Sequence, residues 1–332
     1  MSDPRISIIV VNWNTSEITR KCLASIPEHA RDLDHETILV DNASSDDSVA
    51  RIRAEFPEVR LIENTANIGF GRANNQAMRI ARGRYFLLLN SDTLLIDGSL
   101  SRWLDWLDRG PAIGISGCKL LFEDLRLQTS CSRFPSLRVA TVEELMLYKL
   151  LPRRLRGELL LGGYWDHDRE RDVDCVWGAA MMVRREVFAQ TGGFDERYFM
   201  YGEDLEWCRR VRDRGWRVAF TPETRIVHLD HRSSEKLYGD ARINLCMQRY
   251  YEIYRERRGT AAMSLLFAVK AVGAALRVAY FGVGAKIREG EARRYCASQA
   301  GFYRRCLRYH VGAAAGGGLV AGHPAADGSL AS

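Results

Sequence analysis

The stretch Arg84-Tyr-Phe-Leu-Leu-Leu-Asn-Ser-Asp-Thr93 decides the fold, because a run of large apolar residues, 85–89, ends abruptly in small polar ones. Such a run is typical of a strand that is buried on both faces, as in a parallel sheet covered by helices. Asp92 then follows the carboxyl end of the strand, where open α/β sheets bind ligands. Either Asp92 holds a cation against a phosphorylated ligand, or residues 90–93 form a turn or a helix cap, which is the commoner role of such residues.

Strands and helices are predicted to alternate on the amino-terminal side of this stretch. Apolar runs predict strands at 6–11, 36–40 and 59–62, and helical spacing of apolar residues predicts helices at 16–26, 49–56 and 72–81. Close alternation favours a doubly wound, mostly parallel sheet with helices on both faces. After Asp92 we predict helices at 100–107 and 203–211 and strands at 113–118, 173–183 with a break at Gly178, 216–220 and 226–229, while 119–172 shows no clear pattern.

Composition places the chain among globular proteins. It has 332 residues and a net charge of +6, and its eight cysteines contain no CxxC pair, so reduced thiols are expected rather than a zinc site or a disulfide framework. The mild positive charge fits an anionic substrate or acidic lipid headgroups as well as nucleic acid, and we expect no nucleic-acid partner. The start of the chain lacks the layout of a signal peptide, which predicts a cytoplasmic protein.

Four further residues carry side chains that could act in binding or catalysis. Asp41 ends the second predicted strand and could bind a base or ribose hydroxyl, or cap a helix in its Ser-rich turn. Glu203 and Asp204 open a predicted helix, where acids are stabilised by the helix dipole, although an acid beside aromatic residues could also act as a general base. His228 ends a strand as a metal ligand or as a buried, hydrogen-bonded histidine. Neither a GxGxxG motif nor a Walker loop is present.

Six motifs follow one another at compatible spacing: Ile8-Ile-Val-Val-Asn-Trp-Asn14, Val40-Asp-Asn-Ala-Ser-Ser-Asp46, Asn67-Ile-Gly-Phe-Gly-Arg-Ala-Asn-Asn75, Leu87-Leu-Leu-Asn-Ser-Asp92, Gly178-Ala179, and Gly193-Phe-Asp-Glu196 with Tyr201-Gly-Glu-Asp204. His228 comes after them. With these motifs, residues 5 to 235 resemble glycosyltransferase family 2, in particular its bacterial rhamnosyltransferase-like branch. The resemblance implies a GT-A fold with a Rossmann-like, mostly parallel central sheet flanked by helices. It divides the catalytic domain 1–235 into a nucleotide-sugar half, 1–118, and an acceptor half, 119–235.

The resemblance also implies the residues of the site. Asp204 matches the catalytic base, with Glu203 assisting it, and Asp92 and His228 would bind Mg²⁺ or Mn²⁺. Asn90 stands where the family's acidic motif begins, which leaves one carboxylate for the metal. The donor would be bound by Val11, Asn12, Asn14, Asp41, Asn67, Gly69, Asn74, Ser91 and Asp92, and the acceptor by Trp177, Gly178 and Ala179.

The implied activity is that of an inverting sugar transferase. The donor is expected to be dTDP-L-rhamnose, with a UDP-sugar as the alternative, and the acceptor a saccharide or a lipid-linked saccharide of the cell envelope. A nucleotidyltransferase is less well supported, because no Gly-rich triphosphate loop follows the first strand. A non-catalytic binding module is disfavoured, because both Asp92 and Asp204 are present.

A helical, basic and apolar extension is predicted at 236–311, followed by a disordered tail at 312–332. Residues 261–286 are apolar, but Lys270 and Arg277 interrupt them, so no uninterrupted stretch reaches the length of a membrane span. Basic residues flank the segment at 255–258 and 286–294. This pattern fits an interfacial helix at the inner face of the membrane, and equally a helix packed on the catalytic domain or on a second subunit of a homo-oligomer.

Overall fold

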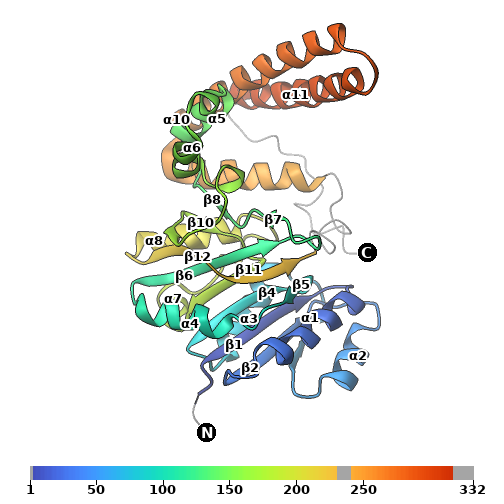
Figure 1. The fold of residues 1–332 in the computed structure, drawn as a ribbon, viewed down its shortest axis with the longest axis vertical. Coiled ribbons are helices and arrows are strands. Elements are labelled where there is room, and N and C mark those ends of the chain that lie inside the picture. The colour runs from blue at the N-terminus through green and yellow to red at the C-terminus, as the bar shows by residue number, and fades with distance from the viewer. Residues whose placement is uncertain (1–2, 230–240, 317–332) are drawn as a thin grey trace. The chain divides into compact units, whose positions relative to one another are not determined.

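The computed structural model describes residues 3–229 and 241–316 (Figure 1). Two compact units are formed, one by residues 1–134 with 160–246 and the other by 135–159 with 247–332. The first contains the strands β1 (Ile6–Asn12), β2 (His35–Asp41), β3 (Arg60–Glu63), β4 (Tyr85–Asn90), β5 (Thr93–Leu95), β6 (Ile113–Leu121), β7 (Leu127–Gln128), β8 (Cys131–Ser132), β9 (Arg171–Asp172), β10 (Cys175–Val176), β11 (Ala180–Arg184) and β12 (Arg217–His228).

The helices of this unit connect the strands. They are α1 (Ser16–His29), α2 (Ser48–Glu55), α3 (Phe70–Ile80), α4 (Leu100–Arg109), the short η2 (Gly162–Tyr164), α7 (Arg185–Thr191) and α8 (Glu203–Asp213). Around them the sheet runs in the order β3-β2-β1-β4-β11-β6-β12-β5, with β7 paired to β6 and β9 to β12. The strands β3, β2, β1 and β4 are parallel to one another, as are β6 and β12, while β11 and β5 run antiparallel to their neighbours. The predicted mostly parallel sheet flanked by helices is confirmed.

Alternate residues of β1 face two different helical layers. Ile6, Ile8 and Val10 pack into a buried cluster with apolar residues of α1, α2 and α4. The opposite face is covered by α3, which contacts β1 and β2, and by α7 and α8, which contact β6. There Phe86 of β4 meets Phe188 of α7 edge to face. Because both faces are covered, continuous apolar runs are what the central strands require.

One predicted break in the sheet is wrong. The segments 216–220 and 226–229 belong to a single strand, β12, which pairs with β6 along its length and shifts register between Thr221 and Arg225. The break at Gly178, by contrast, is present, since β10 ends at Val176 and β11 begins at Ala180. The segment 119–172, for which no pattern was found, contains three two-residue strands and several short helices.

The second unit is helical. Its elements are α5 (Leu137–Glu144), η1 (Leu147–Leu150), most of α6 (Arg153–Leu160), α10 (Ala241–Ile287) and α11 (Gly290–Gly316). The predicted helix at 261–286 is therefore part of a longer one, which bends at Gly259, where φ is 79°. Helix α11 falls largely within the helical extension that was predicted at 236–311. It continues past residue 312, where the disordered tail was expected to begin, and residues 317–332 lie outside the described residues.

Apolar contacts and ion pairs hold α5 and α10 together. Ala140 packs with Tyr251 and Phe267, and the Glu144 carboxylate binds Lys270 at 3.0 Å and Arg277 at 2.7 Å. By length and composition alone, Gln248–Ile287 could cross a membrane. This measure tolerates up to two charged residues in a window of 18, so it does not contradict the prediction that Lys270 and Arg277 interrupt the apolar segment.

Candidate active site

The candidate site lies where β1, β2 and β4 end. Asn12 pairs with Asp41 across β1 and β2, and Val11 pairs with Asn90 across β1 and β4. Parallel strands end at the same edge of the sheet, so these positions form one rim, with Asp92 two residues beyond β4. This is the edge at which open α/β sheets bind ligands.

Asn12 and Asp41 bind each other. The Asn12 side-chain NH₂ donates to Asp41 Oδ1 at 2.7 Å and to Ser44 Oγ at 3.1 Å, while Asn12 Oδ1 accepts from the hydroxyls of Thr15 and Thr19. Asp41 also accepts from the Ser44 backbone N–H at 2.9 Å. Both side chains are buried. In this structure they therefore shape the wall of the site and join the loops after β1 and β2.

Other predicted donor residues lie around these two loops. Asn14 adopts a positive φ of 54°, and its side-chain oxygen accepts from the Ser45 N–H at 2.7 Å. Val11 is half-buried at the end of β1. Ser91 is buried and shares a hydrogen bond with Thr15, with 3.2 Å between the two hydroxyl oxygens. The loops after β1, β2 and β4 are thus joined by side-chain hydrogen bonds.

The segment from Asn67 to Asn74 closes one side of the rim. Asn67 accepts from the Gly69 N–H at 3.0 Å, and Asn74, which is buried, donates to the Phe70 carbonyl at 3.0 Å. The Phe70 N–H donates to the Phe199 carbonyl at 3.0 Å. Gly69 has a φ of 89°, and a Cβ there would collide with that same carbonyl. A glycine is therefore required where the donor side meets the segment that leads to Glu203 and Asp204.

Asp92 and His228 lie side by side on the rim. His228 pairs with Thr93 across β12 and β5, and the Leu229 N–H donates to the Asp92 carbonyl at 2.9 Å. The His228 Nε2 atom is 3.3 Å from Asp92 Oδ1, and both side chains are buried. Asn90 Nδ2 lies 3.4 Å from the same ring nitrogen. The carboxylate and the imidazole thus converge on one point.

This pair fits a divalent cation that is completed by a ligand. Among the residues that the structure describes, no group of three or more His, Cys, Asp or Glu side chains is placed to hold a metal by itself. Mg²⁺ in phosphate-binding sites is commonly held by one or two carboxylates together with the phosphates of the substrate, and imidazole ligands also suit transition ions. Asp92 and His228 supply such a partial set.

Asp204 lies at the start of α8 and is bound by backbone groups. Its Oδ1 atom accepts from the Leu205 N–H at 2.7 Å and its Oδ2 atom from the Gly178 N–H at 3.3 Å. Burial raises the pKa of Asp204 above its usual value despite these two N–H donors, which lower it. Glu203 is buried beside it. A half-buried carboxylate with a raised pKa is suited to accept a proton.

The turn between β10 and β11 links the two acidic positions. The Ala179 carbonyl accepts from the Asn90 N–H at 3.0 Å, and the neighbouring Gly178 donates to Asp204. Trp177 exposes 38% of its surface, in contrast to Gly178 and Ala179, which are buried. The strand β4, which ends two residues before Asp92, and the helix α8, which carries Asp204, are therefore bridged by two consecutive residues.

Two residues of this region escaped the sequence analysis. Gln128 Oε1 lies 3.0 Å from His228 Nδ1, and the Phe199 carbonyl binds the donor-side segment. Phe199 belongs to an aromatic run before Glu203 that could have drawn notice. Gln128 lies in the segment without a clear pattern, and no sequence signal distinguishes it.

Comparison with known proteins identifies the family of the chain. The family model described as "Glycosyltransferase like family 2" matches residues 4–251. An N-acetylglucosaminyl-diphospho-decaprenol L-rhamnosyltransferase of Mycobacterium tuberculosis (strain ATCC 25618 / H37Rv) is 27% identical over 249 residues, which cover 67% of this chain and 75% of the relative. The rhamnosyltransferase WbbL of Escherichia coli (strain K12) is 25% identical over 244 residues, covering 71% and 88%.

Solved structures show the same fold. The mannosyltransferase PcManGT from Pyrobaculum calidifontis, solved in complex with GDP-Man and Mn²⁺, aligns over 95% of this chain and 87% of its own with a TM-score of 0.57 and 19% identity. The predicted GT-A fold and the resemblance to the rhamnosyltransferase-like branch are confirmed. Since the family model spans well over half of its length, the chain belongs to glycosyltransferase family 2 and is a glycosyltransferase.

Proposed function

We propose that this enzyme transfers L-rhamnose from dTDP-L-rhamnose to a hydroxyl group of a saccharide or lipid-linked saccharide, with inversion, in the synthesis of a cell-envelope polysaccharide. The rhamnosyltransferases among its relatives support this donor. The observation that carries the proposal is the bridge from Asn90 through Ala179 and Gly178 to Asp204, since it brings a cation-binding pair and a base to one rim. A UDP-sugar is the alternative donor.

The donor would lie along the ends of β1, β2 and β4. Its nucleotide would contact Val11, Asn14 and Asn67, with Asn12, Asp41, Gly69, Asn74 and Ser91 forming the surrounding wall. The half-buried positions among these are Val11, Asn14 and Asn67, whereas the others are buried. We therefore assign direct contact to the first group and support to the second.

Asp92 and His228 would hold Mg²⁺ or Mn²⁺ against the donor diphosphate. The bound ion would neutralise the negative charge that develops on the leaving group. Glu203 is proposed to assist Asp204, and Trp177, Gly178 and Ala179 to border the acceptor. Trp177 offers an exposed ring face on which a sugar can stack.

Asp204 is the proposed general base. Its carboxylate takes the proton of the acceptor hydroxyl as that oxygen bonds to the anomeric carbon from the face opposite the diphosphate. The bond between the anomeric carbon and the phosphate oxygen breaks in the same displacement, and the electron pair leaves with the nucleoside diphosphate. One displacement inverts the anomeric centre. No covalent sugar intermediate is required.

Donor binding and turnover test the proposal separately. Saturating dTDP-L-rhamnose with Mn²⁺ should raise the melting temperature, because a ligand at 100 times its Kd stabilises the native state by about 2.7 kcal/mol. Asp92→Ala should lose the metal-dependent part of this shift, and Asp172→Ala, which removes an exposed carboxylate paired with Arg217, should keep it. A larger rise in melting temperature with UDP-sugars than with dTDP-L-rhamnose would show that the donor is a UDP-sugar. A shift without slow release of nucleoside diphosphate would indicate a binding module.

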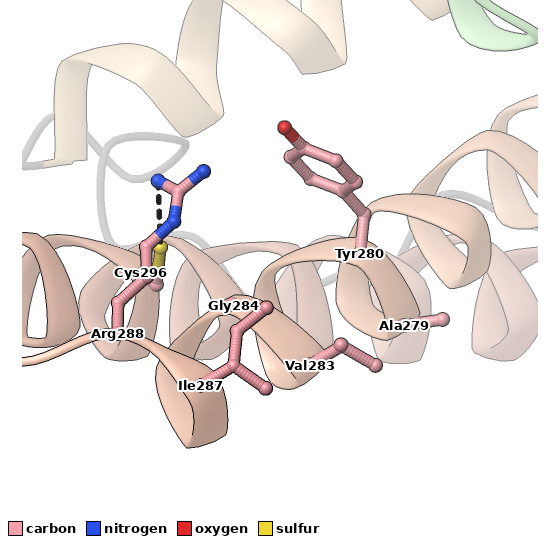
Figure 2. A pocket seen from close by; sticks show the side chains of 7 residues that line it. All are labelled: Ala279, Tyr280, Val283, Gly284, Ile287, Arg288 and Cys296. Carbon is pink, nitrogen blue, oxygen red and sulfur yellow. Dashed lines mark hydrogen bonds between the residues drawn. The ribbon is translucent and has the colours of Figure 1, made fainter.

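The helical unit supports an acceptor at the membrane. Its Lys and Arg residues outnumber its Asp and Glu residues about two to one. Exposed apolar side chains follow one another at helical spacing along α10: Leu265, Val272, Leu276, Tyr280, Val283 and Ile287. A pocket of about 370 Å³ lies beside α10 and is completed by Arg288 and Cys296. Figure 2 shows Ala279, Val283 and Ile287 on the α10 side of this pocket. We propose that the face of α10 formed by these exposed apolar side chains contacts the inner leaflet of the membrane.

Vesicle binding tests this contact. The enzyme should sediment with phosphatidylglycerol vesicles and much less with phosphatidylcholine vesicles. Ile287→Glu should weaken the binding, because Ile287 is 75% exposed on the α10 face, while Leu150→Glu, at a position that is 82% exposed outside this face, should not. Equal losses in both variants would contradict the assignment. A concentration-dependent dimer that Ile287→Glu dissociates would identify the face as a subunit contact.

A further inference from the structure

We infer that Gln128 is a positioning residue that fixes the tautomer of His228, so that the Nε2 lone pair points toward Asp92. The inference rests on the proposed function to the extent that a cation binds between Asp92 and His228. Gln128 touches neither the donor nor the acceptor in this proposal, and it acts through the imidazole.

Two amide side chains contact the imidazole on opposite sides. Gln128 Oε1 lies 3.0 Å from His228 Nδ1, and Asn90 Nδ2 lies 3.4 Å from His228 Nε2. An amide oxygen can only accept a hydrogen bond and an amide nitrogen can only donate one. Gln128 therefore keeps a proton on Nδ1, and in the neutral ring Nε2 then presents its lone pair, so both amide contacts select the same neutral tautomer. A second proton on Nε2 would donate to Asp92 Oδ1 at 3.3 Å, and a cation that binds between the two groups must displace it.

The backbone holds Gln128 in place for this contact. Gln128 pairs with Leu120 across β7 and β6, and Leu120 pairs with Ile226 across β6 and β12, two residues before His228. Gln128 and His228 are only 6% exposed. Neither side chain can readily exchange its partner for water, so the tautomer is set by the protein and not by solvent.

The direction of the lone pair decides what the Asp92–His228 pair can do. With the proton on Nδ1, Nε2 and Asp92 Oδ1, which are 3.3 Å apart, both offer electron pairs to one cation. With the proton on Nε2, the imidazole would instead donate to the carboxylate, and the pair would be closed to a metal. Histidines that bind metals usually donate their other ring N–H to an oxygen, which orients the ring and raises its basicity.

Two substitutions separate positioning from simple packing. Gln128→Leu removes the acceptor but keeps a side chain of similar size, and Gln128→Glu keeps an acceptor for Nδ1–H. Loss of such outer partners typically weakens metal binding about 10- to 100-fold. We expect that loss for Gln128→Leu, and restoration by Gln128→Glu to within a few-fold of the wild type. Gln76→Leu is the matched control, because it makes the same change in helix α3, where the Gln76 side chain donates to the Asn64 side chain.

The tautomer is measured directly in the full-length, metal-free protein. Two-bond ¹H–¹⁵N spectra of ¹⁵N-histidine-labelled enzyme, with His228→Gln to assign the signals, should show His228 protonated at Nδ1, and Gln128→Leu should lose this pattern. Mn²⁺ affinity is then titrated by electron paramagnetic resonance with dTDP present. A wild-type His228 that carries its proton at Nε2 alone would overturn the inference, as would wild-type Mn²⁺ affinity in Gln128→Leu.

The two proposals fail in different ways. If the wild type binds no Mn²⁺ with dTDP, the proposed cation site is wrong, but the spectra still decide the tautomer. If Gln128→Leu does not fold, the wild-type spectra and the Gln128→Glu variant still decide it. Loss of Mn²⁺ affinity in Gln76→Leu as well would show a general effect on the rim and would overturn the role of Gln128.

Discussion

Replacing Asp204 by Asn is the sharpest test of the proposed base. The two side chains have the same shape, but the amide cannot accept a proton at neutral pH. In the structure both carboxylate oxygens accept backbone N–H groups, from Leu205 and Gly178. An Asn can satisfy one of these donors and must turn its own NH₂ group toward the other. The N–H group left without an acceptor costs about 1–3 kcal/mol, which is less than the stability of about 5–15 kcal/mol that is typical of native domains.

The catalytic loss should be larger than the stability loss. A positioned general base contributes about 10²- to 10⁴-fold in rate, or about 3–5 kcal/mol of transition-state stabilisation. We expect kcat for rhamnosyl transfer to fall by that factor in Asp204→Asn, while the donor Kd, measured by calorimetry, changes less than about threefold. Retention of more than about a tenth of the wild-type kcat would refute the assignment. If kcat falls further in Glu203→Gln than in Asp204→Asn, Glu203 is the general base.

The remaining predictions concern pH, the donor-side loop and the core. Because burial raises the pKa of Asp204 and the base works deprotonated, kcat/KM should rise with pH through a pKa above the usual aspartate value, and a pH-rate profile of Asp204→Asn should lack this limb. Gly69→Ala should lose about 1–3 kcal/mol in urea unfolding, from its φ of 89°, and weaken donor binding, since the Phe199 carbonyl must move. Arg184→Met should cost about 3 kcal/mol or more by the same unfolding measurement, because the buried guanidinium donates to the Ile113 carbonyl at 2.6 Å and the Tyr85 hydroxyl at 2.9 Å, and each group left unpaired costs about 1–3 kcal/mol.

The central strands could be predicted because each of them is buried between two layers of helices. Residues 6–11 and 85–89 are covered on both faces, and a continuous apolar run is the direct consequence. The strand β12 was harder, because Pro222 among polar residues suggests a turn. In the structure Pro222 lies within the register shift between Thr221 and Arg225, where a missing N–H does not break the ladder.

The segment 119–172 could not be predicted for a different reason. Its strands β7, β8 and β9 have two residues each, too few for a period to show, and β8 and β9 pair with strands more than forty residues away, while β7 pairs with the nearby end of β6. β8, for example, pairs with β10 more than forty residues later. Gln128 contacts His228 only because of such pairings. Motifs could therefore indicate the rim residues, but not the side chain that orients one of them.

The replacement of an acid by Asn90 has a consequence for how the cation binds. Among the residues that the structure describes, Asp92 is the carboxylate that contacts His228, so this pair carries one formal negative charge when the ring is neutral, and Asn90 lies on the imidazole with its amide nitrogen. A divalent cation held by one carboxylate and one neutral ring keeps a net positive charge, which favours the arrival of a diphosphate. The affinity for the ion and the affinity for the donor must then rise together by the same factor, because coupling between two binding events is reciprocal. Asp92 and His228 would therefore hold a divalent cation more tightly when a nucleotide sugar is bound, and Mn²⁺ affinity should rise with dTDP-L-rhamnose by the same factor as donor affinity rises with Mn²⁺.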